Sequence, residues 1–246
     1  MPRAHRVLLP GHVWHITERC HEQQFLLADV VDRRRWQHWL SESKRRYHLS
    51  VLNYNVTSNH VHLVVRDRGH GEIAASMRLI AGRTAQEFNS REGRHGAFWQ
   101  GRYHATCVDN ETYLLRCLTY VDLNMIRAGA VEHPRDWETS GYLEVQGLAQ
   151  TGSIIDSEGL CELVGVRDAN ALREAHYRLV EEALERDLHR RREGFWSEAI
   201  AVGGQEFVDA FMRQSGRAAR HRQIANIEGG FAVRNCRGPR GGRRSE

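Results

Sequence analysis

The sequence has little cysteine, almost no lysine and no long apolar segment. Its five cysteines are scattered and contain no C-x-x-C pair, which argues against a disulfide framework, a cysteine-ligated zinc site and a redox motif. The N-terminus lacks an apolar run of signal-peptide length, and nowhere do about 18 apolar residues follow one another. We therefore expect reduced thiols, no membrane segment and residence in the cytoplasm.

The charge of the chain is balanced outside its C-terminal tail. From Gly229 onward, five arginines and one glutamate carry a net charge of +4, which equals the formal net charge of the whole chain. Lys44 is the single lysine, so arginine supplies nearly all the positive charge, and its planar guanidinium suits phosphates and guanine edges. A GC-rich coding bias explains the same preference. A case for nucleic-acid binding therefore has to rest on local clusters.

With 41% apolar and 27% charged residues, the 246-residue chain is expected to form one main globular domain with a smaller appendage. Period-two alternation predicts strands, and helical spacing of apolar residues predicts helices. The order strand, helix, strand, strand, helix, strand, helix is the ferredoxin-like arrangement of an α+β fold, with helices packed on an antiparallel sheet. The predicted strands are 12–19, 50–57, 60–66 and 103–108, and the predicted helices are 30–47, 72–91 and about 109–128.

The domain organisation follows from where this pattern ends. We assign residues 1–145 to a catalytic domain and residues 146–228 to an accessory helical unit, with helical stretches at about 168–192 and 204–222. Residues 229–246 are rich in glycine and arginine, and we expect this tail to be disordered.

The strongest local signal is His60-Val61-His62 inside an apolar strand. Alternate side chains of a strand share a face, so the two imidazoles lie on one side and can hold one divalent ion between them. Taken alone, two histidines at this spacing are more often structural than ligating. Their position among valines and leucines favours a ligand, because buried imidazoles without a partner are costly.

The second signal lies on the helix that follows. Its core stripe leaves Tyr120 and Asn124, an i, i+4 pair, on a neighbouring face from which both can reach the histidines. An isolated tyrosine in this position is usually a half-buried aromatic. As a nucleophile, a phenol with a pKa of about 10 needs activation or a polarised target, which an ion held by the histidines supplies at a phosphate. Attack by Tyr120 then gives a phosphotyrosine bond and a free hydroxyl on the other DNA end, and this step is reversible.

Three stretches in the same order resemble the REP-associated tyrosine transposases, which are related to the transposases of the smallest bacterial insertion sequences. These enzymes belong to the HUH superfamily of single-strand DNA nucleases. The resemblance covers roughly residues 2 to 145, and the combination is far more specific than any one stretch. The stretches are PRAHRVLLPGHVWHITERC, NVTSNHVHLVV and FWQGRYHATCVDNETYLLRCLTYVDLNMIRAGAV.

The resemblance implies a role for each matching residue. His60 and His62 correspond to the metal ligands, Tyr120 to the nucleophile and Asn124 to a further ligand on the metal side. Tyr113, seven residues earlier, is the rival nucleophile, but it does not stand before V-x-x-N. The family's usual Asn-Pro is Asn124-Met125 here, so the helix is expected to continue without its usual break.

The resemblance also implies a partner and a cofactor. The partner is single-stranded DNA with hairpins derived from repeated palindromes, and the protein is expected to act as a monomer or a homodimer. Phosphate chemistry favours Mg²⁺ or Mn²⁺, and histidine ligands lean toward Mn²⁺. Aromatic and arginine side chains of the N-terminus and of the FWQGR loop are candidate DNA contacts, although Phe98 and Trp99 are equally consistent with capping the core. The candidates are Arg3, Arg6, Phe98, Trp99, Gln100 and Arg102.

Two other functions remain open at this point. A DNA-hairpin-binding protein without nuclease activity would keep the arginines and tolerate a missing catalytic group. A metal phosphodiesterase that uses water would need a carboxylate base near the histidines. Glu111 and Asp122 lie on the helix of Tyr120, but we expect them to point elsewhere.

Overall fold

The centre of the molecule is a sheet made from the four strands predicted first. Strand β1 (Val13–Arg19) lies between β3 (His60–Arg66) and β4 (His104–Val108), and β2 (Ser50–Val56) pairs with the other edge of β3; all three pairings are antiparallel. The order β2-β3-β1-β4 interleaves two β-α-β units, which confirms the ferredoxin-like α+β fold. This computed structural model describes residues 8–149, 153–190 and 193–236.

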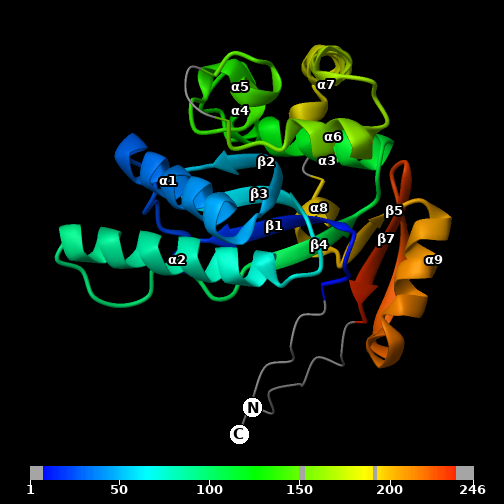
Figure 1. The fold of residues 1–246 in the computed structure, drawn as a ribbon, viewed down its shortest axis with the longest axis horizontal. Helices are drawn as coiled ribbons and strands as arrows, with labels where there is room; N and C mark the ends of the chain where they lie inside the picture. Colours follow the sequence, from blue (N-terminus) through cyan, green and yellow to red (C-terminus); the bar gives the residue numbers. More distant parts are fainter. Residues whose placement is uncertain (1–7, 150–152, 191–192, 237–246) are drawn as a thin grey trace, which may run out of the picture.

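Two long helices lie in front of this sheet in Figure 1 and have the bounds that the sequence predicted. Helix α1 (Val30–Tyr47) begins where the Asp29 carboxylate accepts the Val31 N–H at 2.9 Å, and it ends at His48, whose φ of 56° is left-handed. Helix α2 (Glu72–Arg91) packs along α1. The buried residues of both helices face the sheet and complete its apolar side.

The third predicted helix is broken in the structure. Helix α3 (Thr112–Asp122) is followed by the single turn α4 (Asn124–Arg127), and Leu123 between them has a ψ of 2°. The expectation of a helix that continues through Asn124 is therefore wrong, because the break occurs without a proline. Gly129 ends α4 with a φ of 68°, in the terminating role expected for it. Asn124 thus begins a new turn.

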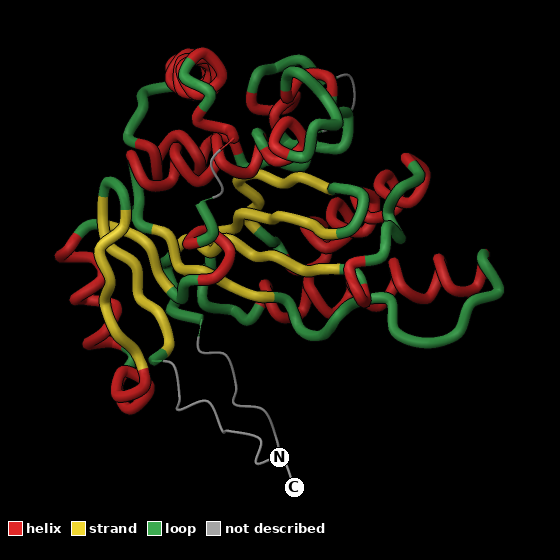
Figure 2. Tube along the Cα trace, turned by 180° about the vertical axis from the view of Figure 1, so that it is seen from behind, coloured by secondary structure: helices red, strands yellow, loops and turns green. Residues whose placement is uncertain are grey.

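The C-terminal part of the chain extends the same sheet. Strand β5 (Ala201–Gly203) pairs parallel with β4, and the hairpin of β6 (Arg222–Ile227) and β7 (Gly230–Asn235) continues from it, giving a seven-stranded sheet. Figure 2 shows these strands in yellow beside the central four. The prediction of a purely helical C-terminal unit is therefore wrong, and so is the prediction of a disordered tail that begins at Gly229. Residues 237–246 of that tail lie outside the described residues.

The remaining helices cover the other side and the end of the sheet. The pattern predicted two stretches at 168–192 and 204–222, and each contains one longer helix, α7 and α9. None of the helices in the described ranges is long and apolar enough to cross a membrane. The further helices are α5 (Tyr142–Val145), α6 (Ser157–Val164), α7 (Ala169–Glu185), α8 (Phe195–Glu198) and α9 (Gln205–Gln214). The 3-10 turns are η1 (His21–Gln23), η2 (Pro134–Asp136), η3 (Leu188–Arg190) and η4 (Gly216–His221).

The register of the sheet separates a polar face from an apolar face. His62 of β3 is paired with Thr17 of β1 and with Asn55 of β2, so these three side chains form a polar row on one face. His15 lies on the same face, two residues along β1 from Thr17. Helix α3 lies over this face, where Asn55 donates to the Val121 carbonyl at 2.8 Å.

Candidate active site

The His60 ring is held in one tautomer by the hairpin turn that begins β3. Its Nδ1 lies 2.9 Å from Thr57 Oγ1 and 2.7 Å from Asn59 Oδ1. The Thr57 hydroxyl uses its own proton to donate to the His60 carbonyl at 2.7 Å, so both oxygens act as acceptors for Nδ1–H. The proton of the neutral ring is therefore on Nδ1, and its lone pair is on Nε2.

His62 is held by a directional chain of hydrogen bonds that starts at a main-chain carbonyl. His15 Nδ1 donates to the Trp196 carbonyl at 2.7 Å, which leaves His15 Nε2 as an acceptor. His62 Nδ1 donates to that atom at 2.9 Å, and its own Nε2 is then unprotonated. The two rings are stacked, with centroids 5.1 Å apart. The chain fixes the tautomer in which His62 Nε2 can bind a cation.

Burial keeps both members of this chain neutral. His15 is fully buried and His62 is 2% exposed. Loss of solvation lowers the pKa of His15 to about 4, and it lowers the pKa of His62 well below its usual value. Neighbouring positive groups, His60 first among them, act on His62 in the same direction. At neutral pH the rings present lone pairs rather than charge.

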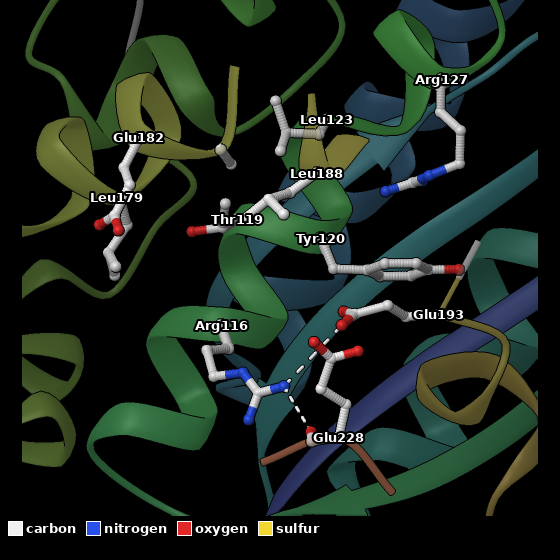
Figure 3. Close-up of a pocket in the computed structure, with 11 residues that line it drawn as sticks. Arg116, Thr119, Tyr120, Leu123, Arg127, Leu179, Glu182, Leu188, Glu193 and Glu228 are labelled. Carbon is white, nitrogen blue, oxygen red and sulfur yellow. Dashed lines mark hydrogen bonds and ion pairs between the residues drawn. The ribbon is translucent and has the colours of Figure 1, made fainter. Parts of the chain in front are cut away.

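Tyr120 projects from α3 onto the histidine face. Its ring is 7% exposed and meets the His62 ring edge-on, with centroids 5.9 Å apart. The guanidinium of Arg127 lies over the phenol ring at 4.6 Å from its centroid. In Figure 3 the ring lies between Arg127 and Glu193, with its hydroxyl at the end that points away from Leu179 and Glu182.

A cavity of about 240 Å³ joins the two predicted sets of residues. The turn at Leu123 brings Asn124 against His62, and its amide nitrogen lies 2.9 Å from His62 Nε2. The structure thus brings together all four predicted residues, from β3, α3 and α4. The residues that line the cavity are Arg19, Gln23, Asn59, His60, His62, Tyr120, Asn124, Arg127 and Ser197.

The donors in this cavity fit a divalent ion, although the set is unusual. No three His, Cys, Asp or Glu side chains of the described ranges gather to hold a metal, so a metal bound here would need Asn124 beside His60 and His62. Two ligands bound side by side to an octahedral ion at about 2.1 Å lie about 3 Å apart. The 2.9 Å between His62 Nε2 and the Asn124 amide matches that separation once the amide is turned to present its oxygen. Two imidazole nitrogens beside one amide oxygen would suit Mn²⁺ slightly better than Mg²⁺.

The rival groups lie elsewhere. Tyr113 is two turns before Tyr120 on α3, and its hydroxyl lies beside Gly204 and Gly230. Asp122 is buried, accepts from Asn53 Nδ2 at 3.0 Å and lies 2.8 Å from His176 Nε2. Glu111 is exposed before the helix begins. Both acids of the helix therefore lie away from the cavity, as expected, and none of the described residues that line it is an aspartate or glutamate.

The predicted DNA contacts in the FWQGR loop divide into buried and exposed residues. Phe98 is 2% exposed and packs against Phe88 and Trp99, so it belongs to the core. The prediction that Phe98 contacts DNA is therefore wrong. Trp99 is half-buried and donates through Nε1 to the Ala81 carbonyl at 3.0 Å. Gln100 is exposed, and its N–H donates to the carbonyl of Arg19, which lines the cavity.

Arg102 of the same loop is exposed and stays a candidate contact. Arg3 and Arg6 lie outside the described residues. Sequence reasoning missed His15, which holds His62, and the other residues that line the cavity, namely Arg19, Gln23, Asn59, Arg127 and Ser197. Alternation in the first strand placed His15 on a polar face, but only the pairing of β1 with β3 puts it against His62.

The comparisons with known proteins agree with this geometry. Residues 10–124 match a family model described as "Transposase IS200 like". That stretch contains β1, both histidines, Tyr120 and Asn124. Residues 10–124, called the IS200-like domain below, are thus similar to this transposase family over slightly less than half of the chain. The IS200-like domain thus ends at the last predicted site residue, and the C-terminal strands and helices lie beyond it.

A solved structure has a fold similar to that of this chain. It is described as "Structure of the REP associates tyrosine transposase bound to a REP hairpin"; it is 20% identical, covers 63% of this chain and 94% of its own, and has a TM-score of 0.50. A putative transposase from Deinococcus radiodurans is 17% identical, covers 44% of this chain and 86% of its own, and has a TM-score of 0.35. No curated protein matches the sequence.

Proposed function

We propose that this protein is a transposase that cleaves and rejoins single-stranded DNA beside hairpins through a covalent bond to Tyr120. The observation that carries the proposal is one cavity in which Tyr120 meets His60, His62 and Asn124, with His62 held in its ligating tautomer by His15. The hairpin substrate is supported by the related transposase structure, which is bound to a REP hairpin. It also agrees with Arg19 and Arg127, which line the cavity.

In the proposed step, the phenolic oxygen of Tyr120 attacks phosphorus, and the bond from phosphorus to the oxygen of the neighbouring nucleotide breaks. The phenolic proton goes to solvent, and the leaving oxygen takes up a proton to become a hydroxyl. One phosphodiester replaces another, so a DNA hydroxyl can reverse the step and join strands. No carboxylate base is needed in the cavity for this exchange.

The residues of the cavity would bind the phosphate in different ways. Arg127 keeps the Tyr120 ring in place and, with Arg19, contributes positive charge beside the attacked group. His60, His62 and Asn124 would hold Mg²⁺ or Mn²⁺, and a bound ion would polarise a phosphate oxygen and offset the charge of the transition state. The His15 chain keeps the His62 lone pair directed into the cavity.

The test is a denaturing gel of the protein incubated with labelled hairpin DNA from the repeats of its host, with Mg²⁺ or Mn²⁺. We expect a covalent protein–DNA band that requires the metal, disappears in Tyr120→Phe and persists in the matched control Tyr113→Phe. Cleavage without a covalent band would instead identify a water-using phosphodiesterase. Binding without cleavage on any such hairpin would identify an inactive DNA-binding protein.

A further inference from the structure

A second cavity, of about 260 Å³, opens on the other side of the Tyr120 ring. Its floor is the outer face of α3, and its walls come from α7, η3 and the β6–β7 turn, all of which lie beyond the IS200-like domain. Cavities for drug-sized ligands have volumes of about 300–1,000 Å³, so this one suits a smaller flat group. Apolar side chains line most of it, namely Leu123, Leu179, Ala183 and Leu188, together with the ring of Tyr120.

The polar rim of this cavity is fixed by interactions within the protein. Arg116 donates to the main-chain carbonyls of Glu228 and Gly229, at 3.0 Å in both cases, and lies 3.8 Å from the Glu193 carboxylate (Figure 3). Glu193 also accepts from Trp196 Nε1 at 2.8 Å. These interactions hold Arg116 and Glu193 in place at the edge of the cavity.

The two cavities share a wall made of Tyr120 and Arg127. A DNA strand whose phosphate lies at the Tyr120 hydroxyl would therefore bring a flanking nucleotide to this shared wall, within reach of the second cavity. Single strands are commonly held by placing bases against apolar and aromatic side chains.

The charges at the rim decide which part of a nucleotide fits. The lining carries three carboxylates, those of Glu182, Glu193 and Glu228, against the two guanidiniums of Arg116 and Arg127, so it favours a neutral base over a phosphate. The same carboxylates accept hydrogen bonds from amino groups, which adenine, cytosine and guanine carry and thymine lacks. The rim thus favours the edge of an amino-bearing base.

We propose that this cavity takes up one unstacked, amino-bearing nucleobase from a nucleotide that flanks the phosphate attacked by Tyr120. The inference rests on the proposed function, because it places the strand by the tyrosine. It assigns the C-terminal part of the chain a direct role in binding the substrate. The base would lie against Leu188 and the Tyr120 ring, with its amino group toward the carboxylates.

The test measures DNA binding without chemistry. In the Tyr120→Phe background, hairpin oligonucleotides with one abasic nucleotide at each position around the cleavage site are titrated by fluorescence anisotropy. We expect one flanking position at which loss of the base raises Kd about 10-fold, as for a stacked base. Thymine at that position should bind more weakly than the other three bases.

A pair of tryptophan variants ties this position to the cavity. Leu188 lines it and is 52% exposed, whereas Leu148 lines a separate cavity and is 59% exposed. Leu188→Trp fills the cavity, so we expect its Kd for intact DNA to rise about 10-fold and the abasic substitution to add nothing further. Leu148→Trp should behave like the parent protein.

The outcomes separate this inference from the proposed function. A covalent adduct in the wild type, combined with no position-specific loss or with an unchanged abasic effect in Leu188→Trp, would overturn the cavity assignment alone. Failure of the wild type to bind or attach to any hairpin DNA would overturn both. A single sensitive position that becomes insensitive only in Leu188→Trp supports the assignment.

Discussion

The two faces of the central sheet are both buried, yet they differ in what the burial accomplishes. Under α1 and α2 the strands present valine, leucine and isoleucine, whose burial stabilises the fold. Under α3 the same strands present His15, Thr17, Asn55 and His62, and the two histidines and Asn55 make specific hydrogen bonds there. Alternate residues of one strand therefore serve different purposes, one set stabilising the fold and the other forming the site. Neighbouring residues of β3 allow this separation to be tested.

The largest effect is expected on the polar face. Replacing His62 with alanine removes the proposed metal ligand and the partner of both His15 and Asn124. We expect the rate of covalent adduct formation to fall on the order of 10³-fold, as for loss of one electrostatic contact to a transition state. Circular dichroism should show a folded variant. An active His62→Ala protein would contradict the assignment of the site.

The matched change on the apolar face is Leu63→Ala. Leu63 is fully buried, and its removal leaves a cavity that costs about 2–5 kcal/mol of the free energy of unfolding. Urea titration measures this loss. The folded fraction should form the adduct at a rate close to that of the wild type. A large loss of chemistry with intact stability would show that the two faces are not separable.

A smaller effect is expected from His15, which acts through His62. His15→Gln keeps a polar side chain at the buried position but removes the ring that accepts from His62 Nδ1. Loss of such a partner typically lowers metal affinity or activity about 10- to 100-fold. Isothermal titration with Mn²⁺ in the presence of non-cleavable hairpin DNA measures the affinity directly. An unchanged affinity would assign His15 a purely structural role.

The smallest effect concerns pH. Because burial lowers the pKa of His15 to about 4, the unfolded chain binds a proton at higher pH than the folded protein. His15 therefore contributes stability in full above about pH 6.5, and this contribution is lost as the pH falls through 4. Between these values the free energy of unfolding of His15→Gln should depend on pH less steeply than that of wild type. The difference in slope should correspond to the uptake of at most one proton on unfolding. An equal slope would exclude the titration of His15.

Much of the ferredoxin-like core could be predicted because its signals are local. The bounds of α1, α2 and β3 follow from apolar spacing within each segment. Strands β5, β6 and β7 were missed because β5 has only three residues and pairs with β4, which lies far away in sequence. The turn at Glu228-Gly229 was the one local cue for the hairpin, since Gly229 has a φ of 69°.

The site shows the same limit. His60, His62, Tyr120 and Asn124 carry spacing and family signals that can be read from the chain. The partners of these residues carry no such signal, because they come from segments distant in sequence. Arg19 lies at the end of β1, and the Trp196 carbonyl belongs to α8. The break at Leu123 was also unpredicted, although it decides where the Asn124 amide points.

The sequence by itself determined the alternation that places two histidines on one face of β3 and the helix that carries Tyr120. These features depend on residues a few positions apart, and the geometry of strands and helices fixes them. Only the tertiary structure decided which tautomer His62 adopts, which arginines flank the phenol and that the C-terminal elements form a cavity against Tyr120. Those properties depend on strand register and on packing between segments distant in sequence, which no local pattern specifies.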